Sequence, residues 1–350
     1  MEQRRFGDTE LATSPIGFGT WEMSGTMYGK IDATAASRAV GAAIDHGITL
    51  FDTAAVYGPF HSERLLAKAL GARRREVTLV TKVCERLSDD ETLDWRDRIG
   101  PRDGSYEHTI RAAEGCLQRL ATDVIDLLLI HHRDFDTPIA ETIGALERLR
   151  TDGKIRYYGV SNHDVAMLEE CRMAGGAGRI ATNQLPFNLF DRRVEPEILP
   201  WCAANGVGFM SYGTLGFGLL TGAFGADTSF GDDDWRSEGS AFGLPLFRGA
   251  PFRDRLRVGA RLAELAAAHG RTLAQLAIAW VLDHAPVTVA LVGMRNGREL
   301  SENVGAAGWK LSDEIRAEVD RIFAAENVTT YAGTPVTVRP DQQILSEGDD

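Results

Sequence analysis

The chain alternates short apolar segments with longer segments of helical periodicity, and this alternation limits its possible folds more than any other feature. Eight apolar, β-rich segments predict strands at 15–20, 48–53, 77–82, 124–131, 157–162, 180–185, 207–212 and 287–293. Apolar residues at three- and four-residue steps predict helices at 33–46, 61–71, 105–120, 138–150, 164–173, 193–204, 255–284 and 297–306.

Strands that alternate with helices imply parallel neighbours, because a parallel pair needs a crossover connection. Eight strands and their helices favour a (β/α)8 TIM barrel of the α/β class over a doubly wound open sheet. The open sheet would also need a G-x-G-x-x-G turn after its first strand, and GFGTWEMSG does not supply one. We expect one domain over 1–350, with a core at about 5–325 and an irregular tail at 326–350 whose end is mobile.

The composition excludes several classes of protein. Hydrophobic residues make up 44% and charged residues 25%, as in soluble globular proteins, and the net charge of −12 argues against a nucleic-acid partner. The four cysteines form no CxxC pair, so we expect free thiols in a reducing compartment. No secretory h-region and no apolar run of membrane-spanning length is present, which predicts a cytoplasmic protein without a membrane partner.

Two long segments interrupt the alternation, at 84–105 and 213–251. Both follow predicted strands, so in a barrel they lie at the C-terminal face of the strands, where barrel enzymes carry their active sites. We therefore expect both segments to shape a substrate site.

Polar residues stand at the ends of these strands, although strands covered by helices usually read as apolar throughout. In a closed barrel they share one rim: Asp52, Lys82, His131, Ser161, Asn162, Asn183, Gln184 and Tyr212.

These residue types suit the protonation of a carbonyl oxygen. A buried Lys82 and a buried Asp52 on neighbouring strands are expected to pair, because an isolated buried charge is costly. We expect the ammonium to lower the pKa of the nearby Tyr57 from its reference of about 10, so that Tyr57 acts as a proton donor. His131 can donate a hydrogen bond to the same oxygen.

With these residues in place, the chain resembles the aldo-keto reductases over about residues 5–325, including their sugar and aldehyde reductase branch and their channel β-subunit-like branch. The matching motifs occur in the family's order: IGFGTW, FDTAAVYG with SE, TK, DLLLIHH, GVSN, NQ, SYGTLGFGLLTG and VGMRN with SEN. The resemblance implies a (β/α)8 barrel that binds a nicotinamide cofactor, usually NADPH, without a Rossmann motif.

The resemblance also implies a catalytic tetrad of Asp52, Tyr57, Lys82 and His131. His132 stands where the family commonly has tryptophan, and strand alternation predicts that it faces away from His131 or lies at the lip. Residues expected near the substrate are Trp21, Tyr57, His131 and His132. No metal site is expected, because the Asp-rich runs lack ligand periodicity.

The cofactor positions carry over in the same way. Ser161, Asn162 and Gln184 resemble the residues that bind the nicotinamide carboxamide, and Tyr212 resembles the aromatic residue that stacks on the ring. The other positions expected at the cofactor are Gly19, Thr20, Trp21, Asp52, Gly213, Leu215, Gly216, Gly218, Gly293, Arg295, Glu299, Glu302 and Asn303.

The adenosine end departs from the family pattern. Arg295 can bind a 2′-phosphate in bidentate fashion, which favours NADP(H). Glu299 stands where the family usually has Gln or Arg, and a carboxylate there repels a phosphate and accepts from a free ribose hydroxyl, which leaves NAD(H) open.

The sequence thus predicts an NADP-dependent oxidoreductase that reduces an aldehyde or ketone, or oxidises the alcohol. Two alternatives stay open: an NAD-dependent sugar or pyridoxal-type dehydrogenase on the same scaffold, and a cofactor-binding regulatory module like the channel β-subunits. Outside the site, we expect Trp235 near solvent because of its GDDD neighbours, and His163 at the surface or as a cap.

Overall fold

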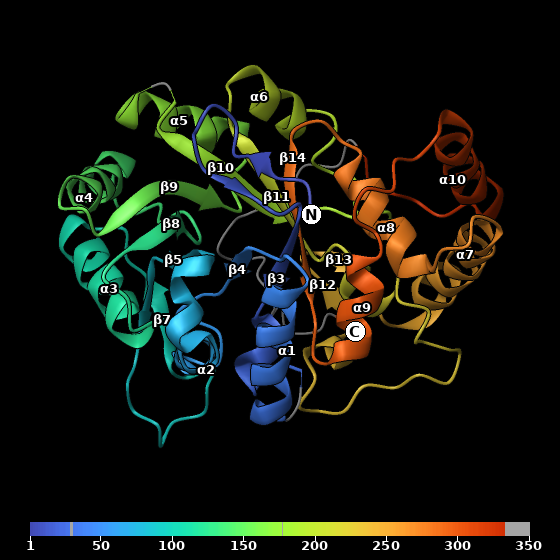
Figure 1. Ribbon diagram of the computed structural model, residues 1–350, viewed down its shortest axis with the longest axis horizontal. Coiled ribbons are helices and arrows are strands. Elements are labelled where there is room, and N and C mark those ends of the chain that lie inside the picture. The colour runs from blue at the N-terminus through green and yellow to red at the C-terminus, as the bar shows by residue number, and fades with distance from the viewer. Residues whose placement is uncertain (29–30, 177, 333–350) are drawn as a thin grey trace.

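The computed structural model describes residues 1–28, 31–176 and 178–332. Its centre is a closed barrel of parallel strands (Figure 1), as the alternation predicts. In order around the barrel, the strands are β3 (Ile16–Gly19), β4 (Leu50–Asp52), β5 (Thr78–Val83), β8 (Ile125–Ile130), β9 (Ile155–Ser161), β10 (Ile180–Pro186), β11 (Gly208–Tyr212) and β14 (Val287–Gly293), which pairs with β3.

The helices surround the barrel (Figure 1). They are α1 (Ala33–Asp45), α2 (His61–Leu70), α3 (Tyr106–Arg119), α4 (Ile139–Thr151), α5 (Val165–Gly175), α6 (Ile198–Ala204), α7 (Gly249–Ala268), α8 (Leu273–Leu282), α9 (Gly297–Val304) and α10 (Asp313–Glu326). Among the described residues, none of these helices has the length and apolar character that crossing a membrane requires.

Side-chain alternation along each strand separates two apolar clusters. On β8, Leu127 and Leu129 point into the barrel, where they pack with residues such as Val80 and Met210. The intervening Leu128 belongs to the larger cluster between strands and helices. Because the strands are buried on both faces, they read as continuous apolar runs, and their polar residues concentrate at the ends.

A short N-terminal hairpin, which the sequence did not predict, adds to the interior of the barrel. Its strands β1 (Arg4–Arg5) and β2 (Ala12–Thr13) pair antiparallel. Phe6 and Leu11, from the turn between them, are buried within the inner cluster. The Phe6 amide donates to the carbonyl of Leu11, which closes this turn.

Both long segments contain structure that the sequence did not predict. In 84–105, β6 (Glu85–Leu87) pairs antiparallel with β7 (Ile99–Arg102). After β11, the chain forms the 3-10 turns η3 (Gly216–Gly218) and η4 (Trp235–Glu238) and the hairpin of β12 (Ser240–Ala241) with β13 (Leu244–Pro245). The two further 3-10 turns are η1 (Trp21–Ser24) and η2 (Gly71–Glu76).

Two helix predictions were wrong in extent, and one helix was missed. The expected helix at 255–284 is two helices, because Gly270 has φ +67° and Thr272 begins α8 with a capping box. The helix expected from residue 193 begins at Ile198. Helix α10 was not predicted and ends at Glu326, one residue inside the expected tail; most of that tail, from 333 on, lies outside the described residues.

The four cysteines are free and buried, as expected. Burial raises the pKa of each thiol, to about 12 for Cys171 and Cys202.

Candidate active site

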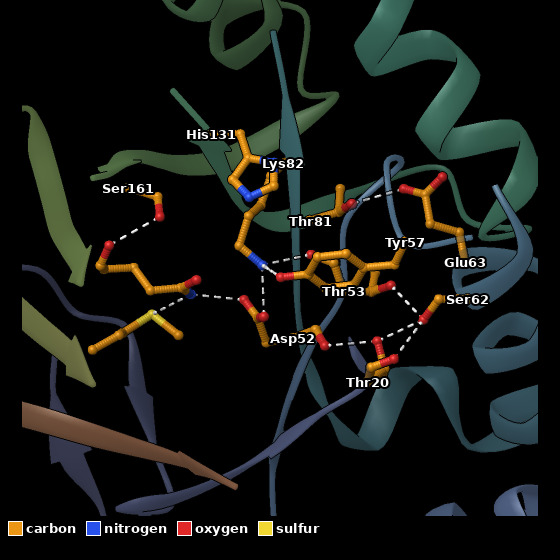
Figure 2. Close-up of polar contacts among 12 residues, drawn as sticks. Thr20, Asp52, Thr53, Tyr57, Ser62, Glu63, Thr81, Lys82, His131 and Ser161 are labelled. Atoms are coloured by element: carbon orange, nitrogen blue, oxygen red, sulfur yellow. Dashed lines mark hydrogen bonds and ion pairs between the residues drawn. The ribbon is translucent and has the colours of Figure 1, made fainter. Parts of the chain in front are cut away.

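The centre of the site is a buried ion pair between two neighbouring strands. Asp52 is the last residue of β4, and Lys82 lies near the end of the adjacent β5. The Lys82 ammonium donates to Asp52 Oδ1 at 2.6 Å, to the carbonyl of Thr53 at 2.9 Å and to Tyr57 Oη at 3.1 Å (Figure 2). The Lys82 side chain is fully buried. In the described part of the chain, these three oxygens are its hydrogen-bond partners, and the Asp52 carboxylate balances its charge.

Hydroxyl groups behind this pair hold the strand ends in place (Figure 2). Thr20 Oγ1 donates to the carbonyl of Asp52 at 2.9 Å, and Ser62 Oγ donates to Thr20 Oγ1 at 2.7 Å. Glu63 is buried beside them, where it accepts from Thr81 Oγ1 and pairs with Arg119 at 2.5 Å. Ser62 and Glu63, the Ser-Glu pair of the sequence motif, lie on α2 and therefore hold the ends of β3, β4 and β5 together.

The surroundings of Tyr57 correct one expectation. Burial of the phenol, together with the carboxylates of Asp52, Glu85 and Glu22, raises the pKa of Tyr57 well above its usual value. From the sequence, we expected Lys82 to lower the pKa of Tyr57. Burial also lowers the pKa of Lys82, although Asp52 opposes this effect. Tyr57 is therefore a protonated phenol at neutral pH.

His131 follows β8 and lies beside Tyr57, with the two ring centroids 6.1 Å apart and nearly perpendicular. Its backbone amide donates to the carbonyl of Val83. Of the two positions expected for His132, the one that faces away from His131 is wrong: its ring stacks on His131 with centroids 4.4 Å apart. The alternation argument fails because β8 ends at Ile130, before either histidine.

The residues expected at the nicotinamide carboxamide form one network at the ends of β9, β10 and β11. Gln184 Nε2 donates to Asp52 Oδ2 at 2.8 Å, and Ser161 Oγ donates to the carbonyl of Gln184. Tyr212 Oη donates to Asn162 Oδ1 at 2.8 Å, and Asn162 Nδ2 donates to the carbonyl of His131. The network links the expected cofactor positions directly to the expected tetrad.

A cavity of about 1020 Å³ runs past all of these groups. Its wall contains most residues that the sequence predicted at the site: Gly19, Thr20, Trp21, Asp52, Tyr57, His131, His132, Ser161, Asn162, Gln184, Tyr212, Gly213, Leu215, Gly218, Gly293, Arg295, Glu299, Glu302 and Asn303. Lys82 and Gly216 lie behind the wall. Glu22, Tyr28, Glu85, Trp95, Arg96 and Phe242 also line it and were not predicted.

One side of the cavity is aromatic. Trp235 stacks on Trp21 with ring centroids 5.4 Å apart, and Phe217 stacks on Phe242 at 5.3 Å. Trp235 is 3% exposed, so the expectation that it lies near solvent was wrong. Its backbone amide donates to the carbonyl of Met27, which joins the segment after β11 to the segment after β3.

The far end of the cavity carries charge. Arg295 pairs with Glu299 at 2.8 Å, and the Arg295 amide donates to the same carboxylate at the start of α9. The Glu22 carboxylate lies against Gly293, where a side chain would overlap it, and burial raises the pKa of Glu22. Arg295 and Arg298 thus line the cavity together with the carboxylates of Glu22, Glu299 and Glu302.

His163 also differs from its expectation as a surface or cap residue. It is fully buried next to Asn162, with Nδ1 2.8 Å from the carbonyl of Ser161. The cap of α5 is Asp164, which accepts from the amide of Met167.

Comparisons with known proteins show the family to which the chain is similar. The model of the Aldo/keto reductase family matches residues 15–324. The chain is 34% identical to aldo-keto reductase YhdN of Bacillus subtilis (strain 168) over 326 residues, which cover 92% of this chain and 94% of that protein.

Solved structures give the same result. The glycerol dehydrogenase AKR11B4 from Gluconobacter oxydans superposes with a TM-score of 0.83 at 34% identity, covering 93% of this chain and 96% of that chain. An aldo-keto reductase from Klebsiella pneumoniae in complex with NADPH gives a TM-score of 0.71 at 28% identity, covering 97% and 99%. From its strand order, its motifs and these matches, the chain belongs to the aldo/keto reductase family.

Proposed function

We propose that the protein is an NADP(H)-dependent oxidoreductase that reduces an aldehyde or ketone to an alcohol and catalyses the reverse oxidation. The observation that carries this proposal is the hydrogen-bonded series Asp52, Lys82 and Tyr57, which ends at the wall of a cavity beside His131. Such a series suits the delivery of one proton to an oxygen atom inside a largely enclosed site.

The residues of the cavity fit a nicotinamide cofactor. Asn162, Gln184 and Tyr212 present amide and aromatic groups at one end, and Arg295 and Arg298 present guanidinium groups at the other. One continuous cavity joins the two ends, as an extended dinucleotide requires. The NADPH complex of the Klebsiella pneumoniae relative supports the same cofactor here.

Tyr57 is the proposed general acid. When bound, the reduced cofactor supplies a hydride to the carbonyl carbon, and negative charge then develops on the carbonyl oxygen. Because the pKa of Tyr57 lies well above its usual value, the phenol keeps its proton until that oxygen becomes a stronger base. Tyr57 Oη then transfers the proton to the oxygen.

Lys82 and Asp52 support this transfer. The Lys82 ammonium already donates to Tyr57 Oη, so its hydrogen bond strengthens as the phenol becomes a phenolate. Asp52 holds the ammonium in that position and keeps it charged against the cost of burial. In the oxidation direction Tyr57 first releases its proton to solvent, and the same charge stabilises the phenolate that then accepts the alcohol proton.

His131 is the proposed second donor to the carbonyl oxygen, since it lines the cavity beside Tyr57. The stacked Trp21 and Trp235 form an apolar wall that limits water near the reacting atoms. His132 and Trp95 line the same cavity and contact the remainder of the substrate in this proposal.

The test replaces the proposed acid. We expect Tyr57→Phe to fold and bind NADPH but to lose at least ~10²-fold in turnover, because the phenol hydroxyl is the only part removed. NADPH oxidation with an activated aromatic aldehyde measures the reaction, and Tyr106→Phe, an exposed tyrosine on α3, is the matched control. Equal turnover by both variants would sink the assignment of Tyr57.

A second candidate is alcohol oxidation as the main direction, with a polyol as substrate. The similarity to a glycerol dehydrogenase supports it, and so do the polar groups of Glu85 and His132 on the cavity wall, which can bind further hydroxyls. Glycerol with NADP⁺ tests this candidate. Cofactor binding without turnover in either direction would favour a regulatory module instead.

A further inference from the structure

Glu85 joins the two histidines on one wall of the cavity. It is the first residue of β6, in the hairpin that the sequence did not predict. Glu85 Oε1 lies 2.7 Å from His132 Nδ1, and Glu85 Oε2 lies 3.4 Å from His131 Nδ1. One carboxylate therefore spans two stacked imidazole rings, with one oxygen for each.

Glu85 and the two histidines can carry two positive charges but only one negative charge. Two protonated imidazoles 4.4 Å apart repel each other, and one carboxylate balances only one positive charge. Burial and the neighbouring His131 lower the pKa of His132 to about 4, so His132 is neutral at pH 7 and donates Nδ1–H to Glu85. Glu85 Oε1 is therefore occupied by His132, and Glu85 Oε2 faces His131.

The carboxylate is ionised. Burial alone would raise the pKa of Glu85, but the two histidines outweigh it and hold that pKa well below its usual value. The Nδ1 atom of His131 is buried and has no hydrogen-bond partner in the described part of the chain. Glu85 Oε2 lies 3.4 Å from this atom, so the carboxylate is placed to pair with the His131 ring when that ring is protonated.

A metal ion explains this arrangement less well. Two histidines and a glutamate are a familiar ligand set, and their donor atoms here lie within 4.8 Å of one another. However, a metal lies in the plane of each imidazole that binds it, and these ring planes differ by only 26° in a stacked pair. A shared carboxylate needs no common plane, so the geometry favours contact of both rings with the Glu85 carboxylate over coordination of a metal.

We propose that Glu85 is a positioning residue that holds His131 in its charged form, with one ring N–H toward Glu85 and the other available to a substrate oxygen. The proposal rests on the proposed function, because a charged donor at that position stabilises the negative charge on a carbonyl oxygen. Neutral His132 then separates the charged ring from the rest of the substrate pocket.

Other charged groups surround the pair. Asp52 and Tyr57 belong to β4 and the turn after it, and Lys82 belongs to β5. Arg102 belongs to β7, and His163 follows β9. Lys82 and Arg102 are cations and oppose a charge on the histidines, whereas Lys82 is itself balanced by Asp52. Glu85 is the carboxylate in contact with the two rings, so its removal leaves burial and the cations to favour neutral His131.

The test is Glu85→Gln, which keeps the shape of the side chain and removes its charge. The expected result is a shift of the high-pH limb of kcat/KM for carbonyl reduction to lower pH by at least about one unit. Turnover at pH 7.5 then falls about tenfold and recovers near pH 6, while NADPH affinity is unchanged. A loss of turnover that is equal at every pH would overturn the proposal, because a structural role predicts that result.

Two further variants complete the design. Glu91→Gln removes an exposed carboxylate of the same segment, which pairs with Arg64 and does not contact the histidines, and should leave the limb in place. Glu85→Asp keeps the charge and should keep most of the wild-type pH profile. If Glu85→Gln does not fold, Glu85→Asp still tests the proposal, although its shorter side chain reaches the histidines only in part. A high-pH limb that shifts in this variant by as much as loss of the carboxylate would cause contradicts the proposal, because the variant keeps the charge.

A measurement without turnover separates this proposal from the proposed function. In protein labelled with [13C-ε1]histidine, the His131 signal is assigned from its absence in His131→Asn. Glu85→Gln should move its titration midpoint down by at least about one pH unit. Unchanged titration overturns the role of Glu85, whereas a shifted titration in a protein that reduces no carbonyl leaves that role standing and removes the proposed function.

Discussion

His163 is a buried histidine that the proposed mechanism does not use. Burial lowers its pKa from an ordinary 6.5 to about 4, although the Ser161 carbonyl opposes the effect. The folded protein therefore keeps this ring neutral where the unfolded chain protonates it. The resulting contribution to stability is complete above pH 6.5 and is lost as the pH falls from 6.5 towards 4.

We therefore expect the His163→Asn variant to lose less unfolding free energy in mild acid than the wild type does. In the wild type, this one group accounts for about 2 kcal/mol of the unfolding free energy lost between pH 7 and pH 5. Urea unfolding at both pH values measures the difference, with His269→Asn at an exposed position as control. A wild-type and a variant protein with the same pH dependence would show that His163 is not buried in its neutral form.

At this scale the sequence predicts the residues that parallel strands bring together. Asp52 and Lys82 end adjacent strands, so their pairing follows from the fold. Glu85 could not be predicted, because its role depends on a hairpin of two short strands with no readable alternation. The position of Trp235 was predicted wrongly because the three aspartates before it suggested a solvated loop. The last of them, Asp234, turns inward and pairs with Arg236.

Among the elements, the start of α9 is the place where we expect the proposed site to discriminate between NADP(H) and NAD(H). Arg295 is paired with Glu299 there, so a 2′-phosphate has to compete with the carboxylate for the guanidinium. Glu22 and Glu302 add two further carboxyl groups to the cavity wall. We therefore expect the preference of the proposed cofactor site for NADP(H) or NAD(H) to depend on the balance among these charges.

We expect Glu299→Gln to increase the preference for NADPH and Arg295→Ala to abolish it. A charge-assisted hydrogen bond contributes about 1.5–3 kcal/mol, so the Arg295 change should reduce the NADPH to NADH affinity ratio by roughly tenfold or more. Titration of intrinsic fluorescence with each coenzyme gives both affinities. Arg261→Ala, on the outer helix α7, should not alter the ratio. An unchanged ratio in Arg295→Ala would assign the selectivity to other groups such as Arg298.

The extent of an element is harder to predict than its existence. All eight barrel strands follow from apolar runs, since burial on both faces imposes them. The strands of the hairpins have only two to four residues, which is too short to show a periodic pattern in the sequence. The break at Gly270 depends on one residue with positive φ. That the whole chain forms one domain stays a prediction.

For the whole molecule, the cavity wall joins distant parts of the chain. Gly19 and Trp21 come from its beginning, and Glu302 and Asn303 come from near its end. A ligand bound along the wall contacts both and dissociates when the barrel unfolds. Cofactor binding and the stability of the barrel are therefore linked.

We expect NADPH at 100 times its Kd to add about 2.7 kcal/mol to the free energy of unfolding, with about 1.4 kcal/mol more for each further tenfold. Thermal unfolding at several NADPH concentrations measures the shift in midpoint. Tyr57→Phe should show the same shift, because the proposal gives Tyr57 a role in proton transfer rather than in cofactor binding. A midpoint that does not move with NADPH would contradict the cofactor assignment.

The four buried cysteines have a practical consequence. Each thiol is buried and its pKa is raised, so little thiolate is present at neutral pH to react with a maleimide or an iodoacetamide. A cysteine introduced at an exposed position, such as Met173 on α5, would therefore react far faster than the native thiols. The wild-type chain is thus already suited to single-site dye labelling without first removing any native residue.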